Sequence, residues 1–449
     1  MWVWRSSVRT VVQRGCSVAD KTKNQSRRTF LRRCTVVGMH SLLAACTVPA
    51  PSAPSVAPTI AQLDTLLLTP TVDAAPATPS PAPDAQPTAV PLLPVAPAPG
   101  PRTMQEAGGR QALIAKAQAE GELTVIGLPH DWLNYGAIIE SFKLQYGIRV
   151  NELTPDSSSD GVLAAVNLAA ISREAIAPDV LDVSFAFGQQ AQDARLLQPY
   201  FVERWAEVPE LLKDDRGYWT AGYYGVIAFA VNKAVVAQTP IGWTDLLKPI
   251  YTGQFAFTGD PHTANQAIQS VYAASLANGG SLDNAAPGLA LVAQLRDAGT
   301  LSGVMANPAL FLQGDTPIIS VWSYIAHALR VQAGSNPLVE VVIPKASVAG
   351  AYVQAINAYA PHPFAARLWL EHVFSDDVQM QWANAYAIPS RASALLADQS
   401  RTGILAALGV TPELLADVQI PTLAQMTAAK ALISEQWDSI VSFDIKALD

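Results

Sequence analysis

From residue 121 onward, short apolar runs alternate with helical periodicities, and this alternation constrains the fold more than any other feature. Residues 123–127 predict a buried strand, 135–146 an amphipathic helix and 148–153 a second strand. Residues 162–172 and 180–183 continue the pattern with a helix and a third strand. Such a chain is expected to form an α/β fold, with ligands at the carboxyl ends of its strands.

Two apolar runs, 224–232 and 351–358, enclose another stretch of alternating strands and helices. A chain that leaves one α/β lobe, builds a second and returns makes two lobes with a cleft between them. We expect each lobe to hold a mixed, mostly parallel sheet flanked by helices. The predicted first lobe comprises residues 105–225 and 355–449, and the second comprises 226–354.

The last predicted helices are amphipathic and carry large apolar side chains. They cover residues 376–385 and 427–441. We expect both to pack back on the first lobe through Met380, Trp382 and Trp437.

Cysteine usage separates the N-terminus from the rest of the chain. The three cysteines, Cys16, Cys34 and Cys46, all lie in the first 46 residues. The folded part therefore has no disulfide framework, cysteine nucleophile or thiolate metal site. It also has no charge-free apolar run of about 18 residues, which argues against a conventional membrane-spanning helix.

Charge is distributed just as unevenly. Of the 29 basic residues nine lie in residues 1–45, which contain a single acid, so the remainder holds 20 basic and 36 acidic residues. A body this acidic does not suit nucleic-acid binding, which depends on basic patches. The same acidity favours a cationic ligand.

The first 45 residues have the features of an export signal. Arg27 and Arg28 precede a short apolar stretch, as in a twin-arginine signal, and residues 43–46 resemble a lipobox in which Cys46 accepts lipid. This predicts a protein anchored by lipid on the outer face of the cytoplasmic membrane, in the periplasm or at the cell surface. A basic disordered tail with a chance cysteine is the alternative.

Residues 46–101 form a predicted tether. Residues 47–101 contain 15 of the 33 prolines and only three charged residues. Such a segment buries too little apolar surface to offset its ordering entropy, so we expect a disordered, semi-rigid spacer.

Several segments of the body resemble the extracellular solute-binding proteins of bacterial ABC importers, over residues 120 to about 440. The nearest branch includes iron(III), thiamine, polyamine and aminoethylphosphonate binders. The resemblance rests on residues 121–125, 142–150, 177–180, 224–232, 259–261, 360–363 and 365–367.

The resemblance implies a type II periplasmic-binding-protein fold whose two lobes close on a solute and then dock on the permease. The receptor would be a monomer, need no cofactor or metal, and catalyse nothing. Its cargo would be a small solute captured between the lobes.

The loop 128–135 follows the first strand, the expected place for a ligand loop. Trp132 offers an aromatic face, and Asp131, Asn134 and Tyr135 offer polar groups. The alternative is that Trp132 packs on its own lobe and Asp131 caps the helix.

The loop 154–161 follows the second strand and contains Asp156 and Ser158. Its amides and hydroxyls suit an anion at a helix N-terminus, whereas its carboxylates suit a cation. The charge of the ligand stays open at this point, and a solvated helix cap explains the loop almost as well.

Three aromatic candidates, Phe185, Tyr223 and Tyr224, lie near the predicted cleft. Core or hinge packing is the alternative for each. In the second lobe Asp260 and Asn265 belong to a segment that matches a cleft-facing loop of the resembled family.

Trp322 and Tyr324 mark a departure from that family. Its iron(III) members carry adjacent tyrosines here, because phenolate oxygens suit a hard cation. Ser323 stands beside Tyr324 instead. We therefore favour a polyamine or a similar amine stacked on Trp132 and Trp322 over ferric iron.

Motifs of common enzyme classes are absent from the sequence. It has no Gly-x-Ser-x-Gly, His-Glu-x-x-His, Walker loop or Gly-x-Gly-x-x-Gly after a strand. An exported hydrolase with an unfamiliar site and a stalked adhesin are the alternatives from other classes.

Overall fold

The computed structural model describes residues 100–172 and 177–447. All of them belong to one compact unit of the chain, residues 55–449. The predicted signal with Arg27 and Arg28, the predicted lipidation site Cys46 and nearly all of the predicted tether lie outside the described residues. Within the described ranges, no helix combines the length and apolarity needed to cross a bilayer.

The described strands form a two-stranded parallel pair, β1-β2, and an eight-stranded sheet. The order in the larger sheet is β3-β9-β5-β7-β6, with β8 and β10 also pairing with β5, and β4 with β9. The strands are β1 (Glu122–Ile126), β2 (Arg149–Leu153), β3 (Val180–Ser184), β4 (Leu197–Gln198), β5 (Trp219–Asn232), β6 (Phe255–Phe257), β7 (Ile318–Trp322), β8 (Val339–Val342), β9 (Ala349–Asn357) and β10 (Ile388–Pro389).

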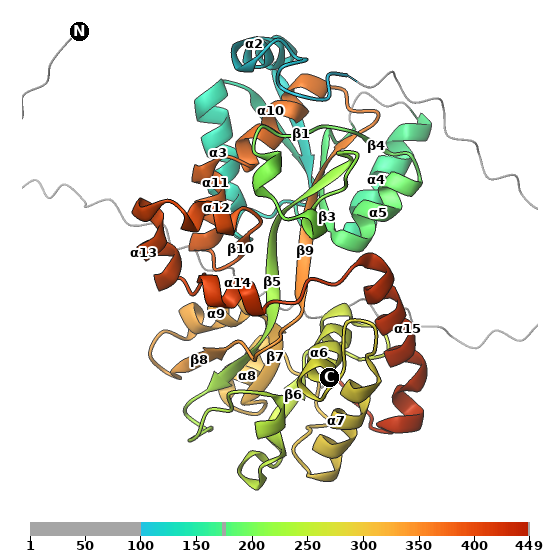
Figure 1. Cartoon of the computed structure of the whole chain (residues 1–449), viewed down its shortest axis with the longest axis vertical. Helices are drawn as coiled ribbons and strands as arrows, with labels where there is room; N and C mark the ends of the chain where they lie inside the picture. Colours follow the sequence, from blue (N-terminus) through green and yellow to red (C-terminus); the bar gives the residue numbers. More distant parts are fainter. Residues whose placement is uncertain (1–99, 173–176, 448–449) are drawn as a thin grey trace, which may run out of the picture. The chain divides into compact units, whose positions relative to one another are not determined.

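Two long strands connect the two groups of elements that we call the lobes (Figure 1). The first half of β5 pairs with β9 and β10, and its second half pairs with β7 and β8. Every residue of β5 is buried, as its continuous apolar sequence requires. The first lobe is built around β1 to β4, β9 and β10, and the second around β6 to β8.

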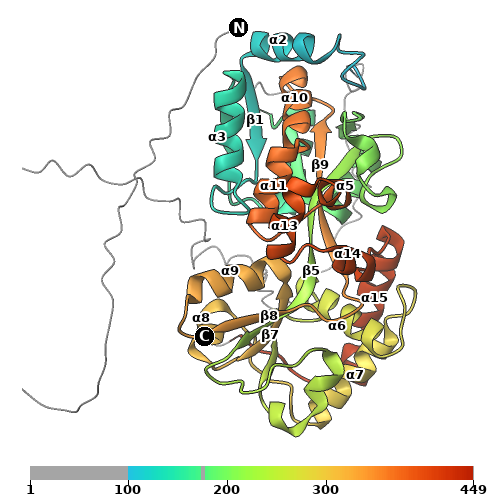
Figure 2. The ribbon, with the colours of Figure 1, turned by 60° about the vertical axis from the view of Figure 1, so that its left-hand side comes forward.

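Helices cover both lobes, as Figures 1 and 2 show. In the first lobe α10 packs against α2, and in the second α6 packs against α7. The described helices are α2 (Arg110–Glu120), α3 (Tyr135–Tyr146), α4 (Ser159–Ser172), α5 (Phe185–Asp193), α6 (Asn265–Ala277), α7 (Ala286–Asp297), α8 (Pro308–Gln313), α9 (Ser323–Ala333), α10 (Pro363–Val373), α11 (Asp376–Asn384), α12 (Ala392–Leu396), α13 (Gln399–Ala407), α14 (Pro412–Asp417) and α15 (Leu423–Ile440).

The predicted α/β class with mixed sheets is confirmed, but the expectation of mostly parallel pairing is wrong. Only β1-β2 and β6-β7 are parallel among the paired strands described. The physical reason is that β5 and β9 run in opposite directions between the lobes. Their neighbours β3, β4, β7 and β8 pair with them antiparallel.

The two C-terminal helices behave differently from each other. As expected, α11 packs in the first lobe, where Trp382 contacts the rings of Tyr135 and Tyr223. The expectation for the last helix is wrong, because α15 packs against α6 and α7 of the second lobe. Figure 2 shows it beside them. Trp437 meets Phe257 of β6, which provides an aromatic partner in that lobe.

We expect Trp437→Ala to destabilise the second lobe. The Trp437 side chain is fully buried, and its indole N–H donates to the Phe443 carbonyl at 3.0 Å. Truncating a buried tryptophan costs about 3–5 kcal/mol of unfolding free energy. Urea unfolding measures this loss, and hydrogen exchange should show faster exchange in α6 and α7.

The matched control is Gln436→Ala, an exposed position on the same helix. It is expected to change stability by less than about 0.5 kcal/mol. Faster exchange around α2 and α10, with α6 and α7 unaffected, would contradict the placement of α15 on the second lobe.

Candidate functional site

Three neighbouring strands bring polar side chains onto one face of the large sheet. Asp182 of β3 lies opposite Gln354 of β9, and Tyr352 of β9 lies opposite Tyr223 of β5. A bulge at Gly222 shifts the register between β5 and β9, so that Tyr223 shares a face with Tyr352. Without this bulge, alternation along β5 would direct Tyr223 to the other face of the sheet.

Asp182 is a buried carboxylate, and no cationic side chain of the described residues pairs with it. Its side chain accepts a hydrogen bond from Gln354 Nε2 at Oδ2, over 2.6 Å. Within the described residues, Oδ1 has no hydrogen-bond partner and the carboxylate makes no ion pair. Burial raises the pKa of Asp182 to about 8, although the hydrogen bond from Gln354 acts in the opposite direction.

Three phenols surround this carboxylate. The rings of Tyr223 and Tyr352 stack with centroids 5.5 Å apart, and Tyr324 enters from the start of α9. Burial first, and the negative charge of Asp182 in addition, raise the pKa of each phenol. The hydroxyls are therefore neutral groups able to donate and accept. We call Asp182, Tyr223, Tyr324, Tyr352 and Gln354 the inner cluster.

Glycine makes room for Tyr324 at this point. A β-carbon on Gly225 of β5 would lie 2.5 Å from Cε1 of Tyr324, so the ring rests directly on the strand backbone. Gly350, the partner of Gly225 on β9, is covered in the same way by the ring of Trp322.

Two ring contacts join the lobes. Trp132, in the loop after β1, meets Tyr324 edge to face with centroids 5.2 Å apart. Tyr386, in the loop after α11, stacks on His327 of α9 at 4.3 Å and lies under the Arg330 guanidinium. Between these contacts is a pocket with walls from both lobes, which we call the outer pocket. Its lining includes Asp131, Trp132, Asn134, Tyr324, Ala328 and Tyr386.

The structure brings six of the sequence-predicted site residues together around this region. Asp131, Trp132, Asn134 and Tyr324 line the outer pocket, and Tyr223 belongs to the inner cluster. Tyr135 lies behind it, where its hydroxyl accepts from Gln354 Nε2 at 3.3 Å.

Other candidates neither line the outer pocket nor belong to the inner cluster. Asp156 and Ser158 are exposed, and Ser158 Oγ accepts from the Gly161 amide at the start of α4. Tyr224 follows Tyr223 on β5, and its side chain is directed to the opposite face of the sheet. Phe185 packs edge to face on Trp219 at 5.0 Å, and Trp322 packs over Gly350.

Asp260 and Asn265 are also outside the inner cluster and the outer pocket. Asp260 accepts from the ring of His262 at 2.6 Å, and the other ring nitrogen of His262 contacts Asp438 of α15 at 3.0 Å. Asn265 is exposed. This loop therefore attaches α15 to the second lobe.

Sequence reasoning missed Asp182, Tyr352 and Gln354. One signal for Asp182 was available: residues 180–184 read Val-Leu-Asp-Val-Ser, and a carboxylate inside a buried strand is costly without a purpose. Tyr352 and Gln354 had no comparable signal, because their role depends on strand pairing.

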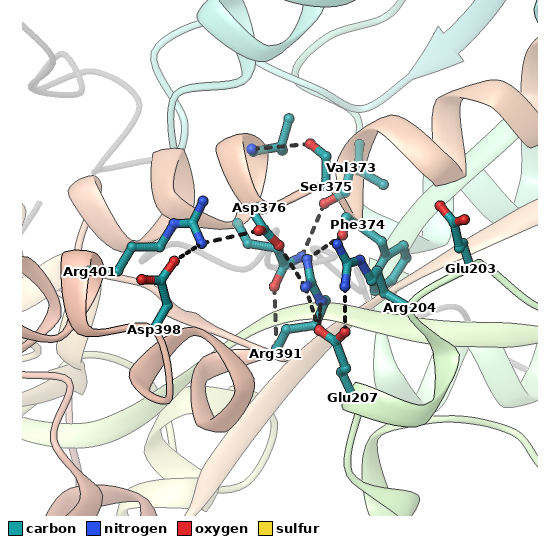
Figure 3. A network of polar contacts seen from close by, with 12 residues as sticks. Glu203, Arg204, Glu207, Val373, Phe374, Ser375, Asp376, Arg391, Asp398 and Arg401 are labelled. Atoms are coloured by element: carbon teal, nitrogen blue, oxygen red, sulfur yellow. Dashed lines mark hydrogen bonds and ion pairs between the residues drawn. The ribbon is translucent and has the colours of Figure 1, made fainter. Parts of the chain in front are cut away.

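A separate ionic network holds the first lobe together (Figure 3). At its centre is Arg391, with a side chain only 2% exposed, which pairs with Glu207 and with Asp376 at 2.7 Å. Arg401 pairs with Asp376 at 3.1 Å and with Asp398 at 2.5 Å. The network links the segment before β5 to α11, α12 and α13.

Comparison with solved structures places this architecture among two-lobed periplasmic binding proteins. Three similar structures are the spermidine/putrescine ABC transporter substrate-binding protein PotD of Streptococcus pneumoniae, iron-bound HitA of Pseudomonas aeruginosa, and AfuA of Actinobacillus pleuropneumoniae with fructose-6-phosphate. Their TM-scores are 0.56, 0.52 and 0.51, at 15%, 17% and 14% identity. They cover 71%, 70% and 72% of this chain and 99% of their own.

The family is established by sequence. The family described as bacterial extracellular solute-binding protein matches residues 176–405, just over half of the chain, and the chain belongs to this family. No curated protein matches it. It is thus a substrate-binding protein of an ABC transporter, a class that is exported, delivers ligands to permease subunits and is generally non-enzymatic.

Proposed function

We propose that this protein captures a small organic amine, such as a polyamine, between its lobes and delivers it to an ABC permease. The observation that carries the proposal is the Asp182 carboxylate, buried among phenols with one oxygen free of partners in the described structure. A buried carboxylate is stable when a cation pairs with it. An ammonium group is such a cation.

The inner cluster also matches the hydrogen-bonding needs of an ammonium group. Such a group has three donors and no acceptor. Asp182 Oδ1 and the hydroxyls of Tyr223, Tyr324 and Tyr352 are acceptors in one place. The rings of Trp132 and Tyr324 add electron-rich faces, which attract cations.

Entry to the cluster requires the lobes to part. Trp132 and Tyr324 touch across the lobes, so an opening motion at β5 and β9 would separate them and admit the solute. Closure then buries the ligand between the lobes. A monomer held by lipid at Cys46 on the outer face of the membrane would present the closed form to the permease.

Ferric iron is the second candidate, because three phenols and one carboxylate meet in the inner cluster. Phenolate and carboxylate oxygens are ligands for hard cations. Against this, burial and the charge of Asp182 make the phenols of Tyr223 and Tyr324 difficult to ionise. One carboxylate matches the charge of an ammonium better than that of a trivalent ion.

A thermal-shift screen of the purified protein distinguishes these ligands. The panel contains putrescine, spermidine, thiamine, ferric citrate, aminoethylphosphonate, phosphate and sugars. An amine at about 100 times its Kd stabilises the folded state by about 2.7 kcal/mol, which raises Tm by several degrees. A shift with ferric citrate alone, together with visible absorbance from iron phenolate, would show that the ligand is ferric iron and not an amine.

We expect Trp132→Ala to weaken ligand binding and Trp322→Ala to lower stability. Trp132 is half-buried and lines the outer pocket. Its replacement removes a desolvated cation–π contact and the packing around it, so putrescine binding should weaken by about 5–30-fold. Trp322 packs on Gly350, so its loss should lower Tm and leave Kd within about threefold. Calorimetric titration and thermal melts of both variants measure this. The reverse pattern would contradict the assignment of the outer pocket.

A further inference from the structure

The surroundings of Asp182 depend on whether the lobes are together. Asp182, Tyr223 and Tyr352 belong to strands of the first lobe, whereas Tyr324 begins α9 of the second lobe. Tyr324 and Trp132 cover the cluster where the lobes meet. Separation of the lobes removes Tyr324 and admits water to the carboxylate.

In the closed arrangement, the groups facing Asp182 are neutral. They are Tyr223 from β5, Tyr352 and Gln354 from β9 and Tyr324 from α9, with Tyr135 of α3 behind Gln354. The acids of the helices α4 and α5, Asp160 and Asp193, are exposed. Within the described residues no lysine, arginine or histidine pairs with Asp182. An ionised carboxylate here would be buried without a counter-charge, which is strongly unfavourable.

We infer that Asp182 makes closure of the lobes conditional on a cation: a proton in the empty protein, or the ammonium group of the ligand in the loaded one. This inference rests on the proposed function. In the empty protein, closure takes up one proton on the carboxylate. When an amine is bound, the ionised carboxylate pairs with the ammonium group, and that proton is not needed. At higher pH the empty protein therefore shifts toward the open form, and bound ligand restores closure.

The direction of the pH effect follows from proton linkage. Closure raises the pKa of Asp182 from its ordinary value, about 3.9 in water, to about 8. The closed form then binds more protons than the open form between these values, so acid favours empty closure in this window.

His327 opposes this effect, but in a lower pH range. In the closed form it lies against Tyr386 and beside Arg330, and burial first, then the charge of Arg330, lower its pKa to about 4. Exposed histidine titrates near pH 6.5, so acid favours opening only below about that value. Between about pH 6.5 and 8, Asp182 acts without this opposition.

The test is a distance measurement across the lobes of the empty protein. Spin labels are placed at Leu144→Cys on α3 and Leu338→Cys just before β8, both exposed positions, in the full chain with Cys16, Cys34 and Cys46 changed to serine. Pulsed paramagnetic resonance then gives the ratio of closed to open molecules. It is recorded at about pH 6.8 and about pH 7.8, the window set by the two groups.

We expect the closed-to-open ratio of the wild type to fall by up to about tenfold over this interval, since one proton is lost. Asp182→Asn keeps the shape without the charge and should remain equally closed at both pH values. Asp193→Asn, an exposed carboxylate on α5, should behave as the wild type. An unchanged wild-type ratio, or the same fall in Asp182→Asn, would overturn the inference.

Addition of putrescine at about pH 7.8 separates this inference from the proposed function. Closure of the wild type by putrescine supports both. The expected pH response without any closure by putrescine or spermidine would retain the proton inference and remove the amine as cargo. Closure by putrescine with a pH-independent empty state would retain the cargo and remove the inference.

Discussion

Replacing Asp182 with asparagine is expected to weaken putrescine binding by about 10–100-fold. A hydrogen bond to a charged group contributes about 1.5–3 kcal/mol, and about 1.4 kcal/mol corresponds to a factor of ten in Kd. Asparagine has nearly the same volume as aspartate. Its carbonyl oxygen can still accept the hydrogen bond from Gln354. The main loss is therefore the negative charge that faces the ammonium group.

Calorimetric titration at about pH 7.5 measures this effect, with ammonium ions fully protonated. Asp193→Asn serves as the control, because it removes an equal charge from the exposed end of α5. Its Kd should stay within about twofold, since exposed charges are screened by solvent and salt. Equal affinities of Asp182→Asn and the wild type would show that the ligand does not use the inner cluster.

Arg391→Ala is expected to lower stability as much as the loss of the buried Trp437 side chain does. The guanidinium donates to the Phe374 carbonyl at 2.6 Å and contacts both Glu207 and Asp376. Removing it leaves two partly buried carboxylates without their main partner. Breaking a buried ion pair in this way costs about 3–5 kcal/mol of unfolding free energy.

Arg401→Ala is the matched control in the same network (Figure 3). Arg401 is 27% exposed and pairs with Asp376 and Asp398. When its side chain is removed, water can solvate these two carboxylates in its place. Its loss should cost about 0–1 kcal/mol. Urea unfolding of both variants measures the difference, and equal losses would contradict a central role for Arg391.

The Arg391 effect should shrink in acid. Burial alone would raise the pKa of Glu207 and of Asp376, but hydrogen bonds and charges from Arg391 and neighbouring arginines outweigh burial and lower both values. Such carboxylates add stability above their unfolded pKa, about 4, and lose it as the pH falls through the folded value. The difference between wild type and Arg391→Ala should therefore decline below about pH 4.

Much of the fold was predictable from local pattern. The predicted helix 135–146 coincides with α3, because periodicity and apolar content are properties of short segments. The candidate site was only partly predictable. Trp132 was found from its place in the loop after the first strand, and Tyr324 from the comparison with the resembled family, whereas Asp182 was read as part of a strand.

The sequence alone determined the α/β class, the two-lobed architecture, the family resemblance and the thiol-free acidic body. The class, the lobes and the acidic body follow from composition and short-range periodicity, and the resemblance follows from short residue motifs. None of these depends on distant contacts. Only the tertiary structure decided that α15 packs on the second lobe. An amphipathic sequence indicates that one face of a helix is buried, but it does not indicate which element covers that face.

The inner cluster was also decided by tertiary structure. Pairing of β3, β9 and β5, with a bulge at Gly222, brings Asp182, Tyr352 and Tyr223 onto one face across about 170 residues of sequence. A shift of one residue in that register would turn these side chains to opposite faces. The register depends on pairing between strands that are far apart in the sequence, so it cannot be predicted from any single segment.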